Sequence, residues 1–476
     1  MKTSIFTKAF ALIIMAMISL ATMAEQIDID GIIYEVHDDK LEVLEHPDKY
    51  SGVVIIPDTV IYGGKKFTVT QINIAAFRNC KDLLSVGISA TVNDMDAVCF
   101  YGCESLEEIY VDPDNTAYAS YDRALYDKAM TTIIRCPARV AGEYEIPDGV
   151  TTIEIQAFRE CEMLTSIIMP ETINKIGDSS FLNCSSLTSI NLPDSITSIG
   201  EGSFAGCSVL ADINIPGSLT EIGNRAFASC AIKEVHLHDK VTDMGMGIFQ
   251  SCSKLEKVTL PESMTDLPEL TFMSCRNLKE IILPDGITSI GTHAFSGCSS
   301  LTSISLPDGI TAISNSCFTG CKSLKSIDLP KNIKEISRYG FRNCTSLQSI
   351  TIPESVETFG DGAFSGCDTL NNVTNLSRIP QDIDDNTFTH YRTLHVPAGS
   401  EQLYAVAEGW KNFNIVGDAP ASDGINDIEA GTKQTQAPAQ YYSIDGKRLT
   451  TASPKGITIV KTGDGKTKKI TSRKRQ

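Results

Sequence analysis

Residues 287–307 read ITSIGTHAFSGCSSLTSISLP, and this stretch decides the fold because closely similar copies of it recur along the chain. The Phe-x-x-Cys element occurs twelve times, from Phe77/Cys80 to Phe364/Cys367, and successive copies from Phe158 onward lie 23 residues apart with a single step of 22 at Phe249. A unit this short cannot bury its apolar face alone, so neighbouring units must stack and share one continuous core. The period therefore predicts a solenoid.

The second half of each unit predicts a short strand. Leu187, Ile190 and Leu192 should point into the core and leave Ser189 and Asn191 outside, because side chains alternate along a strand. Pro193 then ends the strand because it lacks an N–H donor. Such strands stack in parallel, which predicts a leucine-rich-repeat fold with one strand-lined concave face. We expect a tight turn at the glycine that follows the second isoleucine, as at Gly177, Gly200, Gly223 and Gly291.

The repeat resembles the BspA-type leucine-rich repeat over about residues 67–396. A longer unit at about 104–146 resembles the variant repeat of that family through Asn115, Tyr118, Ser120, Asp122 and the Leu125-Tyr126 pair, with Arg123 where a glycine is usual, so the tip of its hairpin should differ. The resemblance implies a secreted or surface protein that mediates adhesion. It also implies host matrix or plasma proteins, such as fibronectin and fibrinogen, as candidate partners.

The N-terminus is typical of a cleavable signal peptide. Residues 1–24 hold Lys2 and Lys8, then an apolar run that ends in small residues, and cleavage is expected near Ala24. This predicts a secreted or cell-surface location. The chain of 476 residues carries a net charge of −18, which argues against a nucleic-acid partner.

Both ends of the solenoid need a cap, because an open end exposes the core. Residues 25–66 are predicted as a β-rich N-terminal cap, and residues 397–418 as a C-terminal cap after a last strand at 394–397. Ser400 should be the N-cap of a short helix that places Leu403, Ala407 and Trp410 on one face.

The chain continues with a linker at 419–440 and a small β module at 441–476, which carries ten basic and two acidic residues. This module resembles the C-terminal sorting domain recognised by a type IX secretion apparatus, on residues 445–448 and 456–460. The resemblance implies the secretion machinery as a possible partner. A plain solvated basic tail is the alternative.

The fifteen cysteines are predicted to be mostly unpaired. Twelve occupy one position of the repeat and should form a column of buried thiols whose side chains all point the same way, which does not suit a disulfide. Cys99, Cys136 and Cys317 lie outside the column, and none has the spacing of a zinc or redox motif.

No catalytic motif and no cofactor-binding motif is recognisable, so we predict a non-enzymatic interaction protein. The candidate binding residues are outward-facing polar side chains of the concave face: Asn191, Asp212, Asn214, Glu234, His236, Lys257, Glu280 and Asp328.

A glycan-binding protein for nutrient capture is the alternative function. It would use aromatic platforms in the variant repeat, with Tyr110, Tyr118 and Tyr121 as candidates.

No metal site is predicted, although Glu234, His236 and His238 share one strand face and are a weak candidate. The alternative is that His238 replaces the strand-ending proline and that Glu234 pairs with Lys257.

Overall fold

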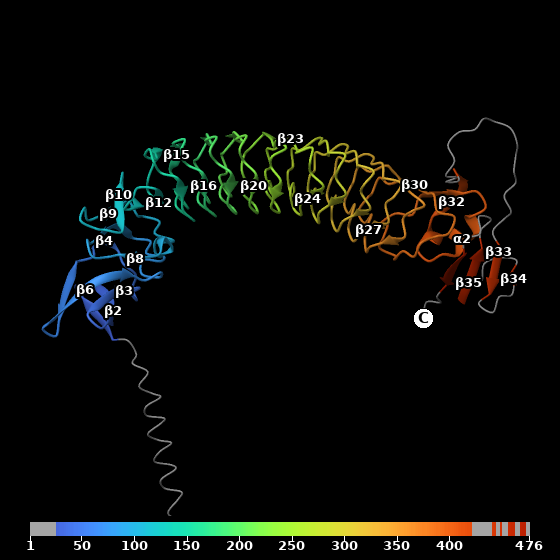
Figure 1. The fold of residues 1–476 in the computed structure, drawn as a ribbon. Coiled ribbons are helices and arrows are strands. Elements are labelled where there is room, and N and C mark those ends of the chain that lie inside the picture. Colours follow the sequence, from blue (N-terminus) through green and yellow to red (C-terminus); the bar gives the residue numbers. More distant parts are fainter. Residues whose placement is uncertain (1–24, 421–439, 444–447, 450–455, 462–466, 473–476) are drawn as a thin grey trace, which may run out of the picture. The chain divides into compact units, whose positions relative to one another are not determined.

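The computed structural model describes residues 25–420 and the strand segments 440–443, 448–449, 456–461 and 467–472 (Figure 1). The chain forms two compact units that divide between Ser186 and Leu187. The predicted signal peptide and most of the predicted linker lie outside the described residues. No helix among the described residues is long and apolar enough to cross a membrane.

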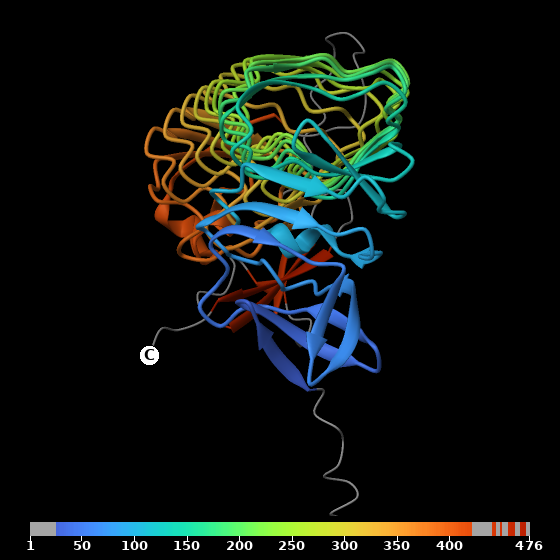
Figure 2. The same ribbon diagram turned by 90° about the vertical axis from the view of Figure 1, so that its left-hand side faces the viewer.

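The N-terminal unit begins with a mixed β-sheet, drawn in blue in Figure 2. Strands β1 (Gln26–Ile29), β2 (Ile32–His37) and β3 (Lys40–Val43) are antiparallel neighbours, and β3 continues in parallel to β6 (Lys65–Ile72). Strand β5 (Thr59–Tyr62) closes the edge, and β8 (Asp94–Met95) also pairs with β6. We call residues 25–50, which hold β1 to β3, the cap hairpins.

Each repeat contributes up to two short strands, and where strands of one kind pair between successive repeats they run parallel. The first kind follows the Leu-x-x-Ile-x-Leu pattern. In the N-terminal unit it comprises β4 (Gly52–Ile55), β7 (Leu83–Ile88), β9 (Glu108–Val111), β13 (Gly142–Glu145) and β15 (Leu164–Ile168). In the C-terminal unit it comprises β17 (Ser189–Ile190), β19 (Asp212–Ile213), β21 (Glu234–His236), β23 (Lys257–Thr259), β28 (Ser349–Ile352), β30 (Asn372–Asn375), β31 (Thr393–Pro397) and β32 (Asn414–Ala419). We call the outward side of these strands, with the equivalent residues of repeats that lack an assigned strand, the first-strand face.

The second kind of strand precedes the position that holds glycine in many of the repeats, as at Gly177 and Gly223. In the N-terminal unit it comprises β14 (Thr152–Ile153) and β16 (Lys175–Ile176). In the C-terminal unit it comprises β18 (Ser198–Ile199), β20 (Glu221–Ile222), β22 (Asp243–Met244), β24 (Asp266–Leu267), β25 (Ser289–Ile290), β26 (Ala312–Ile313), β27 (Glu335–Ile336) and β29 (Thr358–Phe359). These parallel strands confirm the predicted leucine-rich-repeat solenoid.

A column of phenylalanines fills the core between the strands. From Phe204 to Phe388 in the C-terminal unit, neighbouring rings have centroids 5.0 to 6.0 Å apart and planes within 20° of parallel. The 23-residue period places one ring on each turn, so every ring is covered on both sides by its neighbours. This is the shared core that the repeat predicts.

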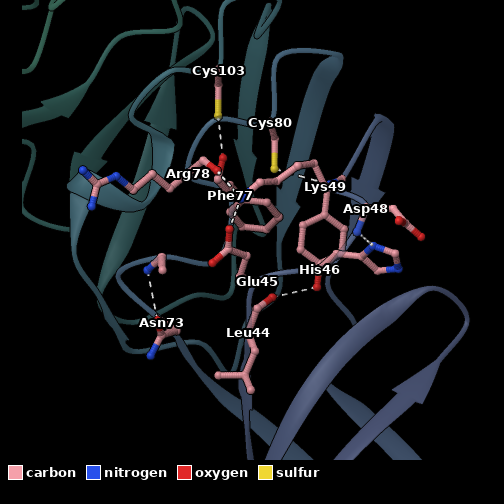
Figure 3. A network of polar contacts seen from close by, with 12 residues as sticks. Leu44, Glu45, His46, Asp48, Lys49, Asn73, Phe77, Arg78, Cys80 and Cys103 are labelled. Carbon is pink, nitrogen blue, oxygen red and sulfur yellow. Dashed lines mark hydrogen bonds and ion pairs between the residues drawn. The ribbon is translucent and has the colours of Figure 1, made fainter.

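A column of thiols runs beside the rings, and all fifteen cysteines are buried thiols that form no disulfide. Nine of them donate from Sγ to the carbonyl of the phenylalanine one repeat earlier, at 3.0 to 3.2 Å. Figure 3 shows where this column begins, with the Cys103 thiol on the Phe77 carbonyl and Cys80 near Lys49. The thiol therefore gives each of these carbonyls a second hydrogen bond, because the amide of the cysteine in the same repeat already donates to it, as from Cys80 to Phe77 at 3.0 Å.

The predicted tight turn begins at the repeat glycine, as at Gly223, whose carbonyl accepts from the Ala226 amide at 3.3 Å, but the reason for glycine at this position is not conformational freedom. Gly177, Gly223 and Gly291 do not have a φ in the left-handed region. A Cβ on Gly223 would instead lie 2.6 Å from the Glu201 nitrogen, so the glycine is needed for close approach of two neighbouring turns. The residue two positions later takes the left-handed conformation, as at Arg225 with φ 54°.

The variant repeat forms the predicted hairpin from β10 (Tyr118–Tyr121) and β11 (Ala124–Asp127), followed by β12 (Thr132–Arg135). Asp122 and Arg123 form its two-residue turn with φ values of 42° and 68°. Two successive left-handed residues are typical of a type I′ turn, so Arg123 keeps the backbone that glycine would adopt more easily.

The C-terminal end of the solenoid extends beyond the predicted last strand. Helix α2 (Glu401–Val406) begins after Ser400 as predicted, although the Ser400 side chain makes no capping hydrogen bond. The helix ends before Trp410, which lies in the 3-10 turn η2 (Trp410–Asn412), is fully buried and donates from Nε1 to the Gln381 carbonyl at 2.7 Å. The chain then adds β32 in parallel to β31, so β32 is the last strand of the solenoid sheet.

The C-terminal module contains the four strands β33 (Gln440–Ser443), β34 (Arg448–Leu449), β35 (Gly456–Lys461) and β36 (Thr467–Ser472). They form an antiparallel sheet in the order β34-β33-β35-β36. Residues 444–447 lie outside the described residues, and the sorting role stays a prediction.

Candidate functional site

The outward residues of the first-strand face in the C-terminal unit border two neighbouring hollows. One has a volume of about 620 Å³ and is lined by Asn191, Asp212, Asn214 and Glu234 among others. The second has a volume of about 980 Å³ and is lined by Glu234, Lys257, Glu280 and Asp328 among others. Seven of the eight predicted binding residues therefore border the two hollows, and Glu234 borders both.

Asn214, which lines the first hollow, has a structural role because its side chain binds the backbone of the preceding repeat. The Asn214 Oδ1 accepts from the Leu192 amide at 2.7 Å, and its Nδ2 donates to the Leu192 carbonyl at 2.8 Å. The Asn214 side-chain amide thus makes the two hydrogen bonds to the Leu192 backbone that a neighbouring strand would otherwise make, at the point where Pro193 and Pro216 end the strands. The exposed side chains that stay available to a ligand here include the predicted Asn191, Asp212 and Glu234, together with Ser189 and Lys233.

The second hollow contains an exposed apolar side chain that sequence analysis did not select. Ile282 has 85% of its surface accessible, the highest value among the large hydrophobic residues of the described chain. It lies at an outward position because Ile281 and Leu283 point into the core. We call this second hollow the Ile282 hollow.

Charged side chains of both signs border the Ile282 hollow. Lys257 on β23 is in register with Glu234 on β21, and Glu280 lies two residues before Ile282. No ion pair joins Glu234 and Lys257 in the described part of the chain, so the predicted pairing does not form. Their charges face solvent and are free to meet a ligand.

The weak metal candidate is not assembled. The His238 Nε2 lies 2.7 Å from the Pro216 carbonyl oxygen, and its Nδ1 accepts from the Lys240 amide at 3.3 Å. Both ring nitrogens are therefore occupied, which agrees with the interpretation that His238 replaces the strand-ending proline. His236 is exposed on β21 and lines neither hollow.

The three candidate tyrosines of the glycan alternative differ in accessibility. Tyr110 on β9 and Tyr121 on β10 have 49% and 50% of their surfaces exposed. The Tyr118 hydroxyl instead accepts from the Met95 amide at 3.1 Å, and burial raises its pKa. Only Tyr110 and Tyr121 thus offer rings to a ligand.

The buried thiols are poor nucleophiles. Burial raises the pKa of Cys252 and of Cys298 to about 12, so these groups are protonated at neutral pH. A nucleophilic cysteine needs a lowered pKa and an accessible sulfur. The cysteines of this protein are therefore part of its core.

One sequence signal could have singled out Ile282. The outward column that contains it holds polar residues in the neighbouring repeats, namely Asn191, Asn214, His236, Thr259 and Ser305, and a further isoleucine at Ile168. Because side chains alternate along a strand, an isoleucine in this outward column faces away from the core and forms an apolar spot on the surface.

Comparison with known proteins supports this architecture. A family model described as "BspA type Leucine rich repeat region" matches in six copies, over residues 65–140, 141–256, 174–283 and 265–395. A comparison with curated proteins finds no match.

Two solved structures show the similarity. One is a leucine-rich repeat protein from Bacteroides ovatus with 28% identity and a TM-score of 0.51, covering 78% of this chain and 99% of that chain. The other is a leucine rich cell surface protein from Faecalibacterium prausnitzii with 27% identity and a TM-score of 0.49, covering 74% of this chain and 94% of that chain.

Proposed function

The chain belongs to the BspA-type leucine-rich-repeat family, and from this premise we propose that it is a non-enzymatic protein that binds an extracellular protein through the Ile282 hollow. The signal-peptide pattern of residues 1–24 supports a secreted or cell-surface location. The observation that carries the proposal is the exposure of Ile282 inside a hollow with a charged border.

This arrangement resembles the anatomy of a protein interface. Interfaces combine an apolar centre that becomes fully desolvated with a polar rim that excludes water. Ile282 provides the centre, and Glu234, Lys257, Glu280 and Asp328 provide the rim. Burying an isoleucine side chain contributes about 1.5–3 kcal/mol.

The rim favours specificity over strength. It carries charges of both signs, which match a partner with a complementary pattern and make the association rate depend on salt. Its residues include none of the Trp, Tyr or Arg side chains that usually anchor tight interfaces. We therefore expect weak or multivalent binding.

The experiment measures binding of the purified protein to immobilised fibronectin and fibrinogen, and to a glycan panel, in about 0.15 M salt where exposed charges are substantially screened. Ile282→Ala should raise the Kd of a bound protein about tenfold or more, since 1.4 kcal/mol corresponds to a factor of ten. Ile168→Ala is the matched control, because Ile168 occupies the same outward column but lies outside the hollow. Equal losses in both variants, or none in Ile282→Ala, would refute this binding surface.

Glycan binding is the second candidate function, and the half-exposed rings of Tyr110 and Tyr121 favour it. Glycan-binding surfaces commonly use exposed aromatic rings as stacking platforms. If only glycans bind, Tyr121→Ala should abolish binding and Ile282→Ala should leave it unchanged. That outcome would refute adhesion through the Ile282 hollow.

A further inference from the structure

Three ionisable side chains meet at one end of the cap hairpins. Glu35 and His37 lie two residues apart on β2 and share one face of the strand. Glu42 lies on β3 directly opposite Glu35 in the antiparallel register. The His37 Nε2 is 3.3 Å from the Glu42 Oε2 and 3.8 Å from the Glu35 Oε1.

The spacing of these atoms suits a transition-metal ion. One ligand atom from each residue lies within 4.8 Å of the other two. Bonds of about 2.0–2.2 Å in a tetrahedral Zn²⁺ site place ligand atoms about 3.3–3.6 Å apart. Only small side-chain movements would therefore close the three groups around an ion.

A neighbouring amide orients one of the carboxylates. Asn73 donates from Nδ2 to the Glu42 Oε1 at 2.8 Å, which leaves Oε2 directed at His37. The Asn73 backbone is itself held by a hydrogen bond from its amide to the Val43 carbonyl at 2.9 Å. Hydrogen bonds of this kind support the ligands of metal sites by fixing their direction.

The charge of this cluster also calls for a cation. Like charges directly opposite each other on neighbouring strands are destabilising, and Glu35 and Glu42 are such a pair. Among the described residues no lysine or arginine forms an ion pair with either carboxylate, and His37 pairs with both only when its imidazole is protonated. The side chains of His37, Glu35 and Glu42 are 45%, 26% and 20% exposed, so an ion could enter from solvent.

We propose that Glu35, His37 and Glu42 bind a divalent transition-metal ion of the Zn²⁺ type. Imidazole and carboxylate ligands together suit such an ion, whereas Ca²⁺ prefers an all-oxygen site. The His37 Nε2 would bind the ion as a neutral imidazole, and the three protein ligands would leave a coordination position for water. This proposal is independent of the Ile282 hollow.

Isothermal titration of the purified, chelator-treated protein with ZnCl₂ tests the proposal. We expect one saturable ion, and we expect His37→Asn and Glu42→Gln each to weaken binding by at least about tenfold. Asn73→Ala should weaken it about 10–100-fold, the usual cost of losing a hydrogen bond that orients a metal ligand. His236→Asn is the matched control, since His236 is also an exposed strand histidine beside a glutamate.

Unchanged Zn²⁺ binding in His37→Asn, or an equal loss in His236→Asn, would overturn the proposal. So would Ca²⁺ binding as tight as Zn²⁺ binding, because His37 would then have no role. Circular dichroism spectra that match the parent protein would show that the variants are folded, which is expected because all three side chains lie on the surface of the hairpin.

Discussion

Replacing Phe272 by alanine should leave a gap in the ring column and weaken the solenoid on both sides of it. Phe272 is fully buried, and its ring centroid lies 6.0 Å from that of Phe249 and 5.6 Å from that of Phe295. Its carbonyl accepts from the Cys298 thiol at 3.1 Å, and alanine would keep that backbone contact. The substitution thus isolates the contribution of the ring.

The expected loss of unfolding free energy is about 3–5 kcal/mol, the usual cost of Phe→Ala in a core. The upper half of this range is favoured because the variant loses two ring pairs, each contributing about 0.5–1.5 kcal/mol beyond area burial. Urea denaturation followed by far-UV circular dichroism measures the loss. Amide hydrogen exchange should accelerate most in residues 249–295, because each repeat is stabilised by its immediate neighbours.

Ile282→Ala is the control for this prediction, because Ile282 is also a large apolar residue and follows Phe272 by ten residues but is 85% exposed. Its substitution should change stability by less than about 0.5 kcal/mol. A loss below about 1 kcal/mol in Phe272→Ala, or comparable losses in the two variants, would refute the role of the stacked rings.

Two further predictions concern the thiols and the repeat glycines. None of the fifteen cysteines should react rapidly with Ellman's reagent at pH 8 in the folded protein, because all are buried and burial raises the pKa of Cys252 to about 12. All fifteen should react once the protein is unfolded in guanidinium. Several fast-reacting thiols in the folded protein would contradict the buried column. Gly291→Ala should cost about 1–3 kcal/mol in thermal unfolding, because its Cβ would lie 2.6 Å from the Glu269 Cα. Gly217→Ala should be nearly neutral, since its Cβ would meet nothing within 4 Å, and equal effects would contradict the close-approach argument.

Features that repeat along the chain could be predicted from the sequence. The 23-residue step identifies the solenoid, and the position within each repeat predicts whether a residue such as Phe272 or Cys275 is buried, as both are. These predictions hold along the chain because equivalent residues of stacked repeats are surrounded by equivalent residues of the neighbouring repeats. At the repeat glycine, the predicted reason for glycine was wrong: a side chain is excluded there because the backbone of the neighbouring turn lies too close.

The candidate site was less predictable because polar residues at equivalent positions have different partners. Asn214 and His238 occupy outward positions, yet both bind backbone atoms of the preceding turn. Tyr118 likewise uses its hydroxyl on the Met95 backbone. The sequence does not show these partners, because each depends on how closely two turns approach at that point.

By itself, then, the sequence of this protein determined the architecture: a stack of short parallel strands with columns of phenylalanine and cysteine, since a strict period places like residues above one another. The tertiary structure decided which side chains are free to act. It exposes Ile282 between charges and brings Glu35, His37 and Glu42 together across a hairpin. Both outcomes depend on distances between residues of different strands, which strand register and packing set and which no one-dimensional pattern contains.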